Sequence, residues 1–334
     1  METEEIRRLW REANLEALWE SPNAHKPPRT PDTPFKWSWD ALRPLLELAF
    51  QETSPASVER RVLQLMSPHR AEGEEWTVGT IQAAIQCLKP GEVARPHRHT
   101  MTAIRFQIEG SGVTTTVDGK DCIMEYGDLV LTPNWCWHGH RHEGDVPALW
   151  LDVLDVPLHN YLGTGVFQPP PMIEVPETVE DATYSVANVV PDNPVGRTDH
   201  SPKFRYPYVD TIKALAKAPP APDGARRVRY INPLDGGSAT TLVDCLMMEL
   251  DPGQVTKLYR ENSNALMLVV EGEGKSTIGE TSVSWKPLDI ITVPQWNYVS
   301  HHCLTGPARI FVVTDREVMR KLQLHRGNLE GDDA

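Results

Sequence analysis

Three histidines, His97, His99 and His138, are the residues whose types and spacing point most directly to chemistry. His97 and His99 are separated by one residue, so their side chains point to the same face of a β-strand. His138 follows about forty residues later, beyond a hairpin turn that Asp118-Gly119 predicts. Imidazoles that converge from two antiparallel strands of a small barrel make a metal site. We expect this site to drive the protein's chemistry.

Alternation along the neighbouring strands predicts further polar residues beside these histidines. If residues 97–107 form one strand, Arg105 faces the same side as the histidines, and the apolar residues on either side of it face the opposite way. A buried arginine beside a metal suits fork-like recognition of a carboxylate. His140 shares the parity of His138 and could hydrogen-bond an oxygen of a substrate or of bound dioxygen. On the preceding strand one face carries Gln82, Ala84 and Gln86.

Length and composition limit the class of protein to which these residues belong. The 334 residues suffice for two domains, and the net charge of −13 argues against a nucleic-acid surface. No run of apolar residues is long enough to cross a membrane, and the charged N-terminus METEEIRRLWREANLEALWE does not have the pattern of a signal peptide. The five cysteines are odd in number and form no CxxC pair. We therefore expect reduced thiols in a cytoplasmic protein without nucleic-acid or membrane partners.

The chain divides by composition into two strand-rich blocks with connecting segments. An amphipathic helix is predicted within residues 4–20, a second helix over 40–50 with Asp40 as N-cap, and a short one over 210–216. Twelve of the 29 prolines lie between residues 157 and 222, a stretch that we interpret as a connector laid over the surface. The predicted organisation is an N-terminal helical arm and connector (1–70), a metal-binding barrel (71–156), the proline-rich connector (157–227), a second barrel (228–320) and a polar tail (321–334).

The two strand-rich blocks are similar in sequence to each other. PGEVARPHRH, FQIEGSG and YGDLVLTPNWCWHGH align with PGQVTKLYRE, LVVEGEG and PLDIITVPQWNYVSH. This repeat indicates a duplicated barrel. In the second copy, Tyr259, Glu261 and Val299 stand where the first copy has its three histidines, and His301 stands where it has His140. The sequence thus predicts one complete metal site and one copy without ligands.

These motifs also resemble a known family. The spacing of Gly91, the two histidines and Gly110, followed by Gly127, Pro133 and His138, is similar to the two cupin motifs, and the duplication makes the chain resemble a bicupin. PGEVARPHRHTMTAIRFQIEG and TPNWCWHGHRHEG resemble the gentisate 1,2-dioxygenase group, as do ERRVLQL, FRYPYVDTIKAL and VRYINPLDGG outside the site.

The resemblance implies a fold and an activity. The expected fold is dominated by β-structure, with two antiparallel, jelly-roll-like barrels and an N-terminal helical arm. The expected activity is that of an extradiol-type dioxygenase with one Fe(II) per chain in the first barrel. With O2 it would open a salicylate-type aromatic acid between the carboxyl-bearing and hydroxyl-bearing carbons. The resemblance also implies a homo-oligomer, with a tetramer favoured.

One departure from the general cupin pattern fits this chemistry. Many cupins carry a glutamate ligand where this chain has Ala103. Like this chain, the gentisate group uses three histidines and no carboxylate. Three neutral imidazoles leave a divalent metal its full double charge, which a dianionic 2-hydroxybenzoate can balance. By resemblance, the substrate-binding positions are Arg61, Gln86, Arg105 and His140.

Two further positions are candidates for the far edge of the ring. Relatives tend to carry an aromatic residue where this chain has Gln82 and glycine where it has Ala84. The amide of Gln82 suits a polar 5-substituent, as in gentisate or 5-nitrosalicylate. The methyl group of Ala84 would tighten the pocket against fused rings such as 1-hydroxy-2-naphthoate.

Other interpretations remain open at this level. The chain could be a metal-dependent cupin isomerase or decarboxylase that needs no O2, a 1-hydroxy-2-naphthoate dioxygenase of the same family, or a non-catalytic ligand-binding bicupin. Arg105 could serve only in a structural ion pair, and Gln86 could be an ordinary strand residue. His140 and His142 could be supporting or solvent-facing histidines.

Overall fold

The computed structural model describes the chain except for residues 1–2, 21–31, 54–59, 187–188, 194–198 and 333–334. It consists of two units, Met1–Asp32 and Thr33–Ala334. In the first unit, α1 (Thr3–Glu12) and η1 (Leu18–Glu20) replace the single helix predicted over residues 4–20. The helix is shorter because Asn14 has a left-handed backbone. Trp10 then packs edge-on against Trp19 at 6.0 Å.

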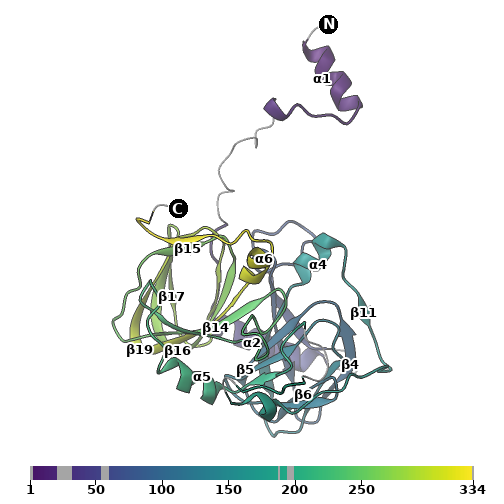
Figure 1. Cartoon of the computed structure of the whole chain (residues 1–334), viewed down its shortest axis with the longest axis vertical. Helices are drawn as coiled ribbons and strands as arrows, with labels where there is room; N and C mark the ends of the chain where they lie inside the picture. Colours follow the sequence, from purple (N-terminus) through teal and green to yellow (C-terminus); the bar gives the residue numbers. More distant parts are fainter. Residues whose placement is uncertain (1–2, 21–31, 54–59, 187–188, 194–198, 333–334) are drawn as a thin grey trace. The chain divides into compact units, whose positions relative to one another are not determined.

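The first barrel of the second unit is made of two antiparallel sheets (Figure 1). The six-stranded sheet has the order β12 (Arg205–Tyr206), β8 (Leu129–Thr132), β5 (Ala103–Glu109), β10 (Ala148–Leu154), β3 (Gln82–Leu88), β2 (Val62–Leu65). The five-stranded sheet has the order β11 (Phe167–Gln168), β4 (Val93–His99), β9 (His138–His142), β6 (Val113–Val117), β7 (Lys120–Met124). Asp118 and Gly119 close the β6–β7 hairpin with positive φ, as predicted.

The second barrel is a nine-stranded antiparallel sheet built on two long strands. β16 (Ala265–Ile278) and β19 (Val299–Thr314) run antiparallel along their length, with register shifts at Glu271 and Glu273. The other strands are β1 (Lys36–Trp37), β13 (Arg226–Arg229), β14 (Asp244–Leu250), β15 (Tyr259–Glu261), β17 (Thr281–Trp285), β18 (Ile290–Val293) and β20 (Gly327–Leu329). The predicted fold class, two antiparallel barrels with an N-terminal helix, is confirmed.

A shared hydrophobic core joins the two barrels. Every second side chain of β3, β5 and β10 points away from the interior of the first barrel and packs into this core. This is expected because successive side chains of a strand point to opposite faces. Phe106 of β5 stacks on Phe311 of β19 with ring centroids 4.2 Å apart and an interplanar angle of 19°. The opposite face of the same strands lines the interior of the first barrel.

Segments outside the two barrels also contact them. α2 (Trp39–Glu52) begins after Ser38 rather than at the predicted Asp40, and Arg43 pairs with Glu109 of the first barrel at 2.9 Å. β1, just before this helix, pairs with β18 of the second barrel. Residues 36–52 therefore bridge the two barrels.

The proline-rich connector does more than cover the surface. It contains α4 (Val156–Leu162), η2 (Asp181–Tyr184) and α5 (Tyr208–Leu215), and its strands β11 and β12 extend the two sheets of the first barrel. The C-terminal segment carries α6 (Arg316–Lys321) and β20, which pairs with β15. Among the described residues no helix is long and apolar enough to cross a membrane. All five cysteines are buried and free of disulfides.

Candidate metal centre and active site

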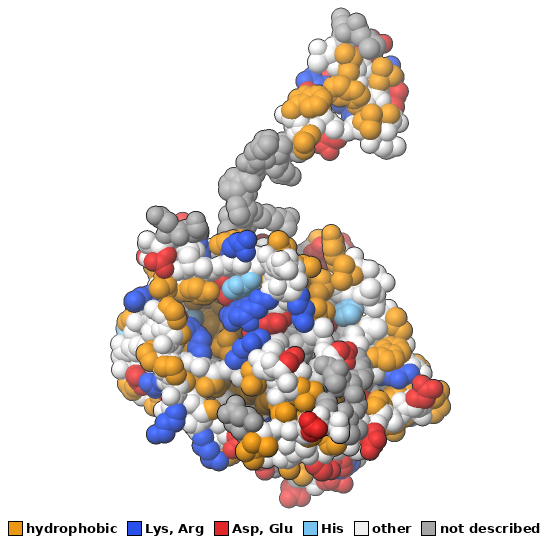
Figure 2. All heavy atoms as spheres, in the orientation of Figure 1, with side chains coloured by type: hydrophobic (Ala, Val, Ile, Leu, Met, Phe, Trp, Pro, Cys, Tyr) orange, Lys and Arg blue, Asp and Glu red, His pale blue; other side chains and the backbone are white. Residues whose placement is uncertain are grey.

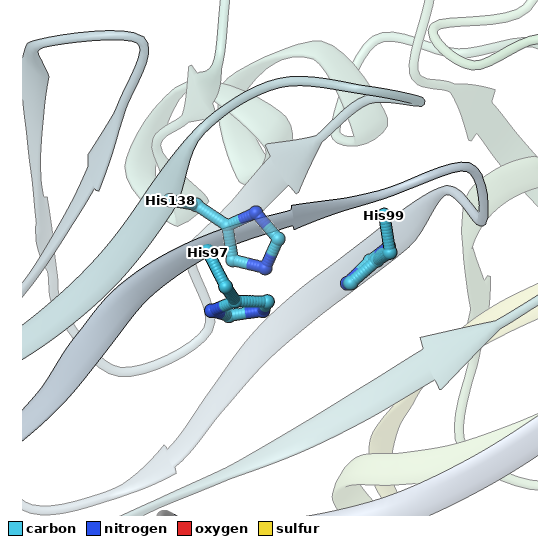
Figure 3. A group of neighbouring side chains, drawn as sticks. All are labelled: His97, His99 and His138. Carbon is cyan, nitrogen blue, oxygen red and sulfur yellow. The ribbon is translucent and has the colours of Figure 1, made fainter. Parts of the chain in front are cut away.

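The structure brings the three predicted ligand histidines together in the interior of the first barrel (Figure 3). His97 and His99 project from β4 and His138 from β9, and the pairing of these strands sets His97 directly opposite His138. One nitrogen of each ring lies within 4.8 Å of one nitrogen of each of the others, and all three residues are buried. Within the described residues this is the only such group of histidine, cysteine and acidic side chains.

Backbone carbonyl groups select the nitrogen that each ring can offer to a metal. Nδ1 of His97 lies 3.2 Å from the carbonyl oxygen of residue 95, Nδ1 of His99 2.8 Å from that of residue 101, and Nδ1 of His138 3.0 Å from that of residue 136. Nδ1–H therefore donates in each ring, and the lone pair is left on Nε2. No described residue hydrogen-bonds Nε2 of His97 or His138. Such unpaired buried nitrogens are what a metal ion would satisfy.

Burial keeps these rings neutral. It lowers the pKa of His99 to about 4 and that of His97 to about 2, with the positive charge of Arg60 adding to the effect at His97. The pKa of His138 also lies well below its ordinary value, chiefly because of burial. Neutral imidazole is the form that binds metals, so all three rings are competent ligands at neutral pH.

The opposite wall of the barrel carries the predicted arginine. The prediction of one strand over residues 97–107 is wrong, because the chain turns at 100–102, where the Asp155 carboxylate accepts the backbone N–H of Thr102 at 2.9 Å. β4 and β5 consequently belong to different sheets, and Arg105 faces the histidines across the interior. In the six-stranded sheet, Ala84, Asp152 and Arg105 form one row across β3, β10 and β5.

Arg105 is buried and held by an acidic partner. Its Nε lies 3.2 Å from Oδ1 of Asp152, and Nη1 donates to the hydroxyl group of Thr132. The indole N–H of Trp150 donates to the same carboxylate at 3.1 Å. Burial raises the pKa of Asp152, and Arg105 opposes this rise. The structural ion pair weighed for Arg105 thus exists, yet no described residue binds Nη2, which remains available to a ligand.

Two predicted contact residues present unpaired polar atoms in the same interior. Nδ1 of His140 bonds to Oγ1 of Thr115 at 2.8 Å, and its Nε2 is buried without a partner among the described residues. Burial, with Arg105 nearby, holds the pKa of His140 well below its ordinary value, so the ring is neutral. The amide nitrogen of Gln86 is likewise buried and unpaired. Gln86 lies opposite Trp150 in the sheet register, one row from Asp152.

The remaining predicted residues lie as follows. Gln82 is buried at the start of β3, and its amide donates to the carbonyl oxygen of Glu75 at 3.4 Å. Ala84 is buried beside Asp152. His142 is a structural residue, because its Nε2 bonds to the carbonyl oxygen of Val146 at 2.7 Å and its Nδ1 accepts the backbone N–H of Gly144.

Arg61 does not reach the histidines. Its guanidinium group donates to both carboxylate oxygens of Glu92, at 2.8 and 2.9 Å. The preceding Arg60 contacts Nδ1 of His97 instead. Neighbouring residues of an extended chain face opposite sides, and the register sets Val62, two residues after Arg60, opposite Gln86. Sequence reasoning missed Arg60 because this register was unknown.

Asp152, Trp150 and Phe167 were also missed. Phe167 of β11 stacks on His97 with centroids 5.3 Å apart, so the connector closes over the metal group. The sequence signal for Asp152 was a single acidic residue in the apolar run ALWLDVL. Such a buried charge calls for a partner of opposite sign.

The second barrel has the same strand pairing around the corresponding position, but it lacks the three histidines. Tyr259 pairs with Val299, as His97 pairs with His138. His301 bonds through Nδ1 to Oγ of Ser276 at 2.8 Å, as His140 bonds to a threonine in the first barrel. The predicted alignment of the two copies therefore holds at these positions.

Fold and site together define the class of protein: a bicupin with one complete three-histidine site. The cupin domain family matches residues 84–154. The chain is 35% identical over 320 residues to a gentisate 1,2-dioxygenase from Ralstonia sp, covering 93% of this chain and 90% of that protein. It is 33% identical to a 5-aminosalicylate 1,2-dioxygenase from Comamonas sp, covering 94% and 87%.

A solved structure agrees with these relatives. Salicylate 1,2-dioxygenase from Pseudoaminobacter salicylatoxidans, in adducts with gentisate, superposes with a TM-score of 0.90 at 29% identity, covering 99% of this chain and 96% of that one. The chain belongs to the gentisate 1,2-dioxygenase family of ring-cleaving dioxygenases. The three-histidine group and this membership support a bound metal.

Proposed function

We propose that the protein is an Fe(II)-dependent dioxygenase that opens a salicylate-type aromatic acid between its carboxyl-bearing and hydroxyl-bearing carbons. The observation that carries the proposal is the neutral three-histidine group facing a buried arginine, in a chain of this family. The expected term extradiol-type is not supported, because extradiol cleavage lies beside a pair of vicinal hydroxyl groups. The names of the relatives place cleavage between ring carbons 1 and 2.

The charge of the donor set supports this substrate class. Three neutral nitrogens and no carboxylate leave a divalent metal its full charge, and the buried acid Asp152 is committed to Arg105. An ortho-hydroxybenzoate bound as a dianion balances that charge through its carboxylate and phenolate oxygens. When bound, Fe(II) would supply the chelation of these oxygens and the activation of O2.

The chain's own residues bind and orient the acid. Nη2 of Arg105 and the amide nitrogen of Gln86 are donors for the substrate carboxylate, and Asp152 positions Arg105. With Nε2 of His97 as a metal ligand, Nδ1 carries the hydrogen and cannot accept from Arg60. Because Arg60 lies beside His97 and adds positive charge there, it is our candidate, in place of Arg61, for a further group that binds the carboxylate. Phe167, against His97, excludes water.

His140 presents Nε2 to the interior in which the substrate would bind. Its ring is neutral and its Nε2 has no partner among the described residues, so it can exchange a hydrogen bond with the phenolic oxygen. The bond from Nδ1 to Thr115 fixes the plane of the ring. Because the low pKa keeps the imidazole neutral, it adds no positive charge that would compete with the metal for the phenolate.

Gln82 and Ala84 are our candidates for the far edge of the ring. Relatives bear the names 5-aminosalicylate and 5-nitrosalicylic acid 1,2-dioxygenase, and gentisate too carries a polar group at carbon 5. A 1-hydroxy-2-naphthoate 1,2-dioxygenase from Nocardioides sp. is 32% identical, so that substrate is the second candidate. The methyl group of Ala84, in the row of Asp152 and Arg105, favours a single ring over a fused one.

Oxygen uptake by iron-loaded protein tests the proposal. Gentisate, 5-aminosalicylate, salicylate and 1-hydroxy-2-naphthoate are each offered with the wild type, with His138→Ala and with the control His302→Ala in the second barrel. Uptake with a monocyclic acid, lost in His138→Ala and kept in the control, is the expected result. Turnover without uptake of O2 would favour the isomerase or decarboxylase interpretation instead.

A further inference from the structure

The carbonyl group that holds His138 belongs to a peptide unit whose N–H group is bound by an acid. Nδ1 of His138 lies 3.0 Å from the carbonyl oxygen of Cys136, and the N–H of Trp137 donates to Oδ1 of Asp118 at 2.7 Å. This C=O and this N–H belong to one trans peptide bond, so they point in opposite directions. Asp118 and the His138 ring therefore lie at the two ends of one chain of hydrogen bonds.

This chain of hydrogen bonds is buried along its whole length. Figure 2 shows Asp and Glu side chains at the surface of the molecule, whereas Asp118 is 5% exposed and Trp137 and His138 are 1% exposed. In such an interior hydrogen bonds are stronger, and bonds in series polarise one another. A carboxylate at the N–H of Trp137 therefore makes the carbonyl oxygen of Cys136 a stronger acceptor. The stronger bond to Nδ1–H in turn makes Nε2 of His138 a better electron donor.

The peptide units that hold the other two histidines provide a comparison. The carbonyl group that binds His97 precedes Pro96, which has no N–H group to donate. The carbonyl group that binds His99 precedes the N–H of Thr102, which donates to Asp155 at 2.9 Å. A carboxylate therefore stands behind the peptide units of two histidines, and proline excludes one from the third.

The second barrel separates a role in a turn from a role at the metal. It repeats the bond of Asp155, because Asp315 accepts the N–H of Asn264 at 2.7 Å in the corresponding turn, although no ligand histidine precedes that turn. It does not repeat the carboxylate of Asp118, because the strand register puts Gly279 at the corresponding position. The bond of Asp155 is therefore explained by the turn alone, and the bond of Asp118 accompanies the histidine.

The hairpin turn forms in both barrels without help from this acid. The backbone φ is 43° at Asp118 and 57° at Gly279, and both N–H groups donate across the hairpin, to the carbonyl oxygens of Trp137 and Tyr298 at 2.8 and 2.9 Å. Asn297 occupies the space that a side chain at Gly279 would need, so the second barrel has no room for an acid there. Asp-Gly is a common pair in such turns, but the bond from the carboxylate to the N–H of Trp137 is not part of the turn.

We propose that Asp118 is a positioning residue of the metal centre, which tightens metal binding by polarising the peptide unit that holds His138. It orients the ring through the carbonyl group of Cys136 and raises the electron density at Nε2. Unlike a glutamate in place of Ala103, it takes no coordination position. The inference rests on the metal centre of the proposed function and not on its substrate. Outer partners of ligand histidines change metal affinity by about 10- to 100-fold, so an effect through one intervening peptide is expected to be about tenfold.

The affinity of the full-length protein for Co(II), measured by competition with a chelator, tests the proposal. Asp118→Asn keeps an acceptor for the N–H of Trp137 but removes the charge, and Asp118→Gly removes the acceptor at a position where the backbone suits glycine. The control Asp121→Asn removes an acid of the same hairpin that pairs with Arg141 at 2.7 Å. Urea unfolding of each variant monitors the fold.

The ring N–H signals of histidine-labelled protein without metal give a second readout by NMR. The Nδ1–H signal of His138 should move upfield in both Asp118 variants because its hydrogen bond weakens. The signal of His97, whose peptide unit ends at Pro96, should not move. This readout needs neither a bound metal nor turnover, so it separates the proposal from the proposed dioxygenase function.

We expect the dissociation constant for Co(II) to rise about tenfold in Asp118→Gly and about threefold in Asp118→Asn, and to stay within about twofold in Asp121→Asn. Unchanged affinity in either Asp118 variant would show that the acid serves only the turn and would overturn the proposal. An equal loss in Asp121→Asn and Asp118→Asn, or equal shifts of the His97 and His138 signals, would trace the effect to total charge and overturn it as well. If Asp118→Gly does not fold, Asp118→Asn decides by the same criteria. If the wild type binds no Co(II), the metal centre itself is refuted, and the ring N–H signals decide on Asp118.

Discussion

Position 103 offers a direct test of the charge argument for the metal centre. Ala103 is fully buried in β5, on the face that carries Arg105, where many cupins supply a carboxylate ligand. Ala103→Glu adds one negative charge near the histidines, and Ala103→Gln adds nearly the same volume without charge. If dianionic substrate binding depends on the full charge of the metal, the two variants should differ. If only space matters, they should behave alike.

The size of the difference follows from the dimensions of the site. The three histidine nitrogens lie within 4.8 Å of one another. A glutamate carboxylate placed beside them would therefore lie about 5 Å from the anionic groups of a substrate bound at the same metal. At that separation and an effective dielectric constant of about 20, the added negative charge weakens substrate binding by about 3 kcal/mol for each negative charge on the substrate. This corresponds to roughly two hundredfold in affinity for a single unit of charge.

The assay compares kcat/KM for gentisate in the two variants after iron analysis of each preparation. We expect iron in both, and a value for Ala103→Glu at least about a hundredfold below that of Ala103→Gln. Equal values at equal iron content would refute the charge argument. Loss of iron from Ala103→Gln alone would instead show that the added volume displaces the metal, and Ala103→Ser would then serve as the smaller neutral variant.

Three further predictions concern the pocket, the second barrel and the assembly. Gln82→Leu should lower the preference for gentisate over salicylate by about 1–3 kcal/mol, whereas Arg105→Gln should lower kcat/KM for both acids alike; an unchanged ranking in Gln82→Leu would remove Gln82 from the pocket. Burial, with Arg227 nearby, lowers the pKa of His301 to about 4, so below about pH 6.5 the unfolded chain binds a proton that the folded chain does not, and stability falls on acidification. Between pH 7 and pH 5 this group should lower the free energy of unfolding by about 2 kcal/mol. Urea unfolding should show a smaller loss over the same pH range in His301→Gln. Light scattering should give a homo-oligomer, with a tetramer expected; a 37.5 kDa monomer at micromolar concentration would contradict this.

Sequence patterns of short range predicted the three-histidine group and the repeat. One intervening residue is enough to put His97 and His99 on one face, and Asp118-Gly119 is enough to form the hairpin before His138. The opposite orientation of Phe106 and Arg105 followed from the same period of two. Each inference depended only on the geometry of a strand, which neighbouring residues determine.

The partners of these residues depended on pairing between distant strands, which the sequence did not supply. The choice between Arg60 and Arg61 needed the register of β2 with β3, and a shift of one residue exchanges the two faces. Asp152 became the partner of Arg105 only through the pairing of β10 with β5. The strands β11, β12 and β20 are two or three residues long, too short to show any periodicity.

The second barrel shows why a cupin barrel without metal ligands can keep the strand arrangement of a metal site. Its core is shared with the first barrel through Phe311, so its strands cannot move far without disturbing Phe106 on β5. Inside it, the indole N–H of Trp285 donates to the hydroxyl group of Ser276, which in turn forms a hydrogen bond with Nδ1 of His301. Replacing either residue with an apolar one would leave a buried polar group unpaired, at about 1–3 kcal/mol. A histidine in a cupin barrel can thus be held in place by hydrogen bonds alone. In the first barrel, by contrast, three ring nitrogens converge, and the described residues leave Nε2 of His97 and of His138 without a hydrogen-bond partner.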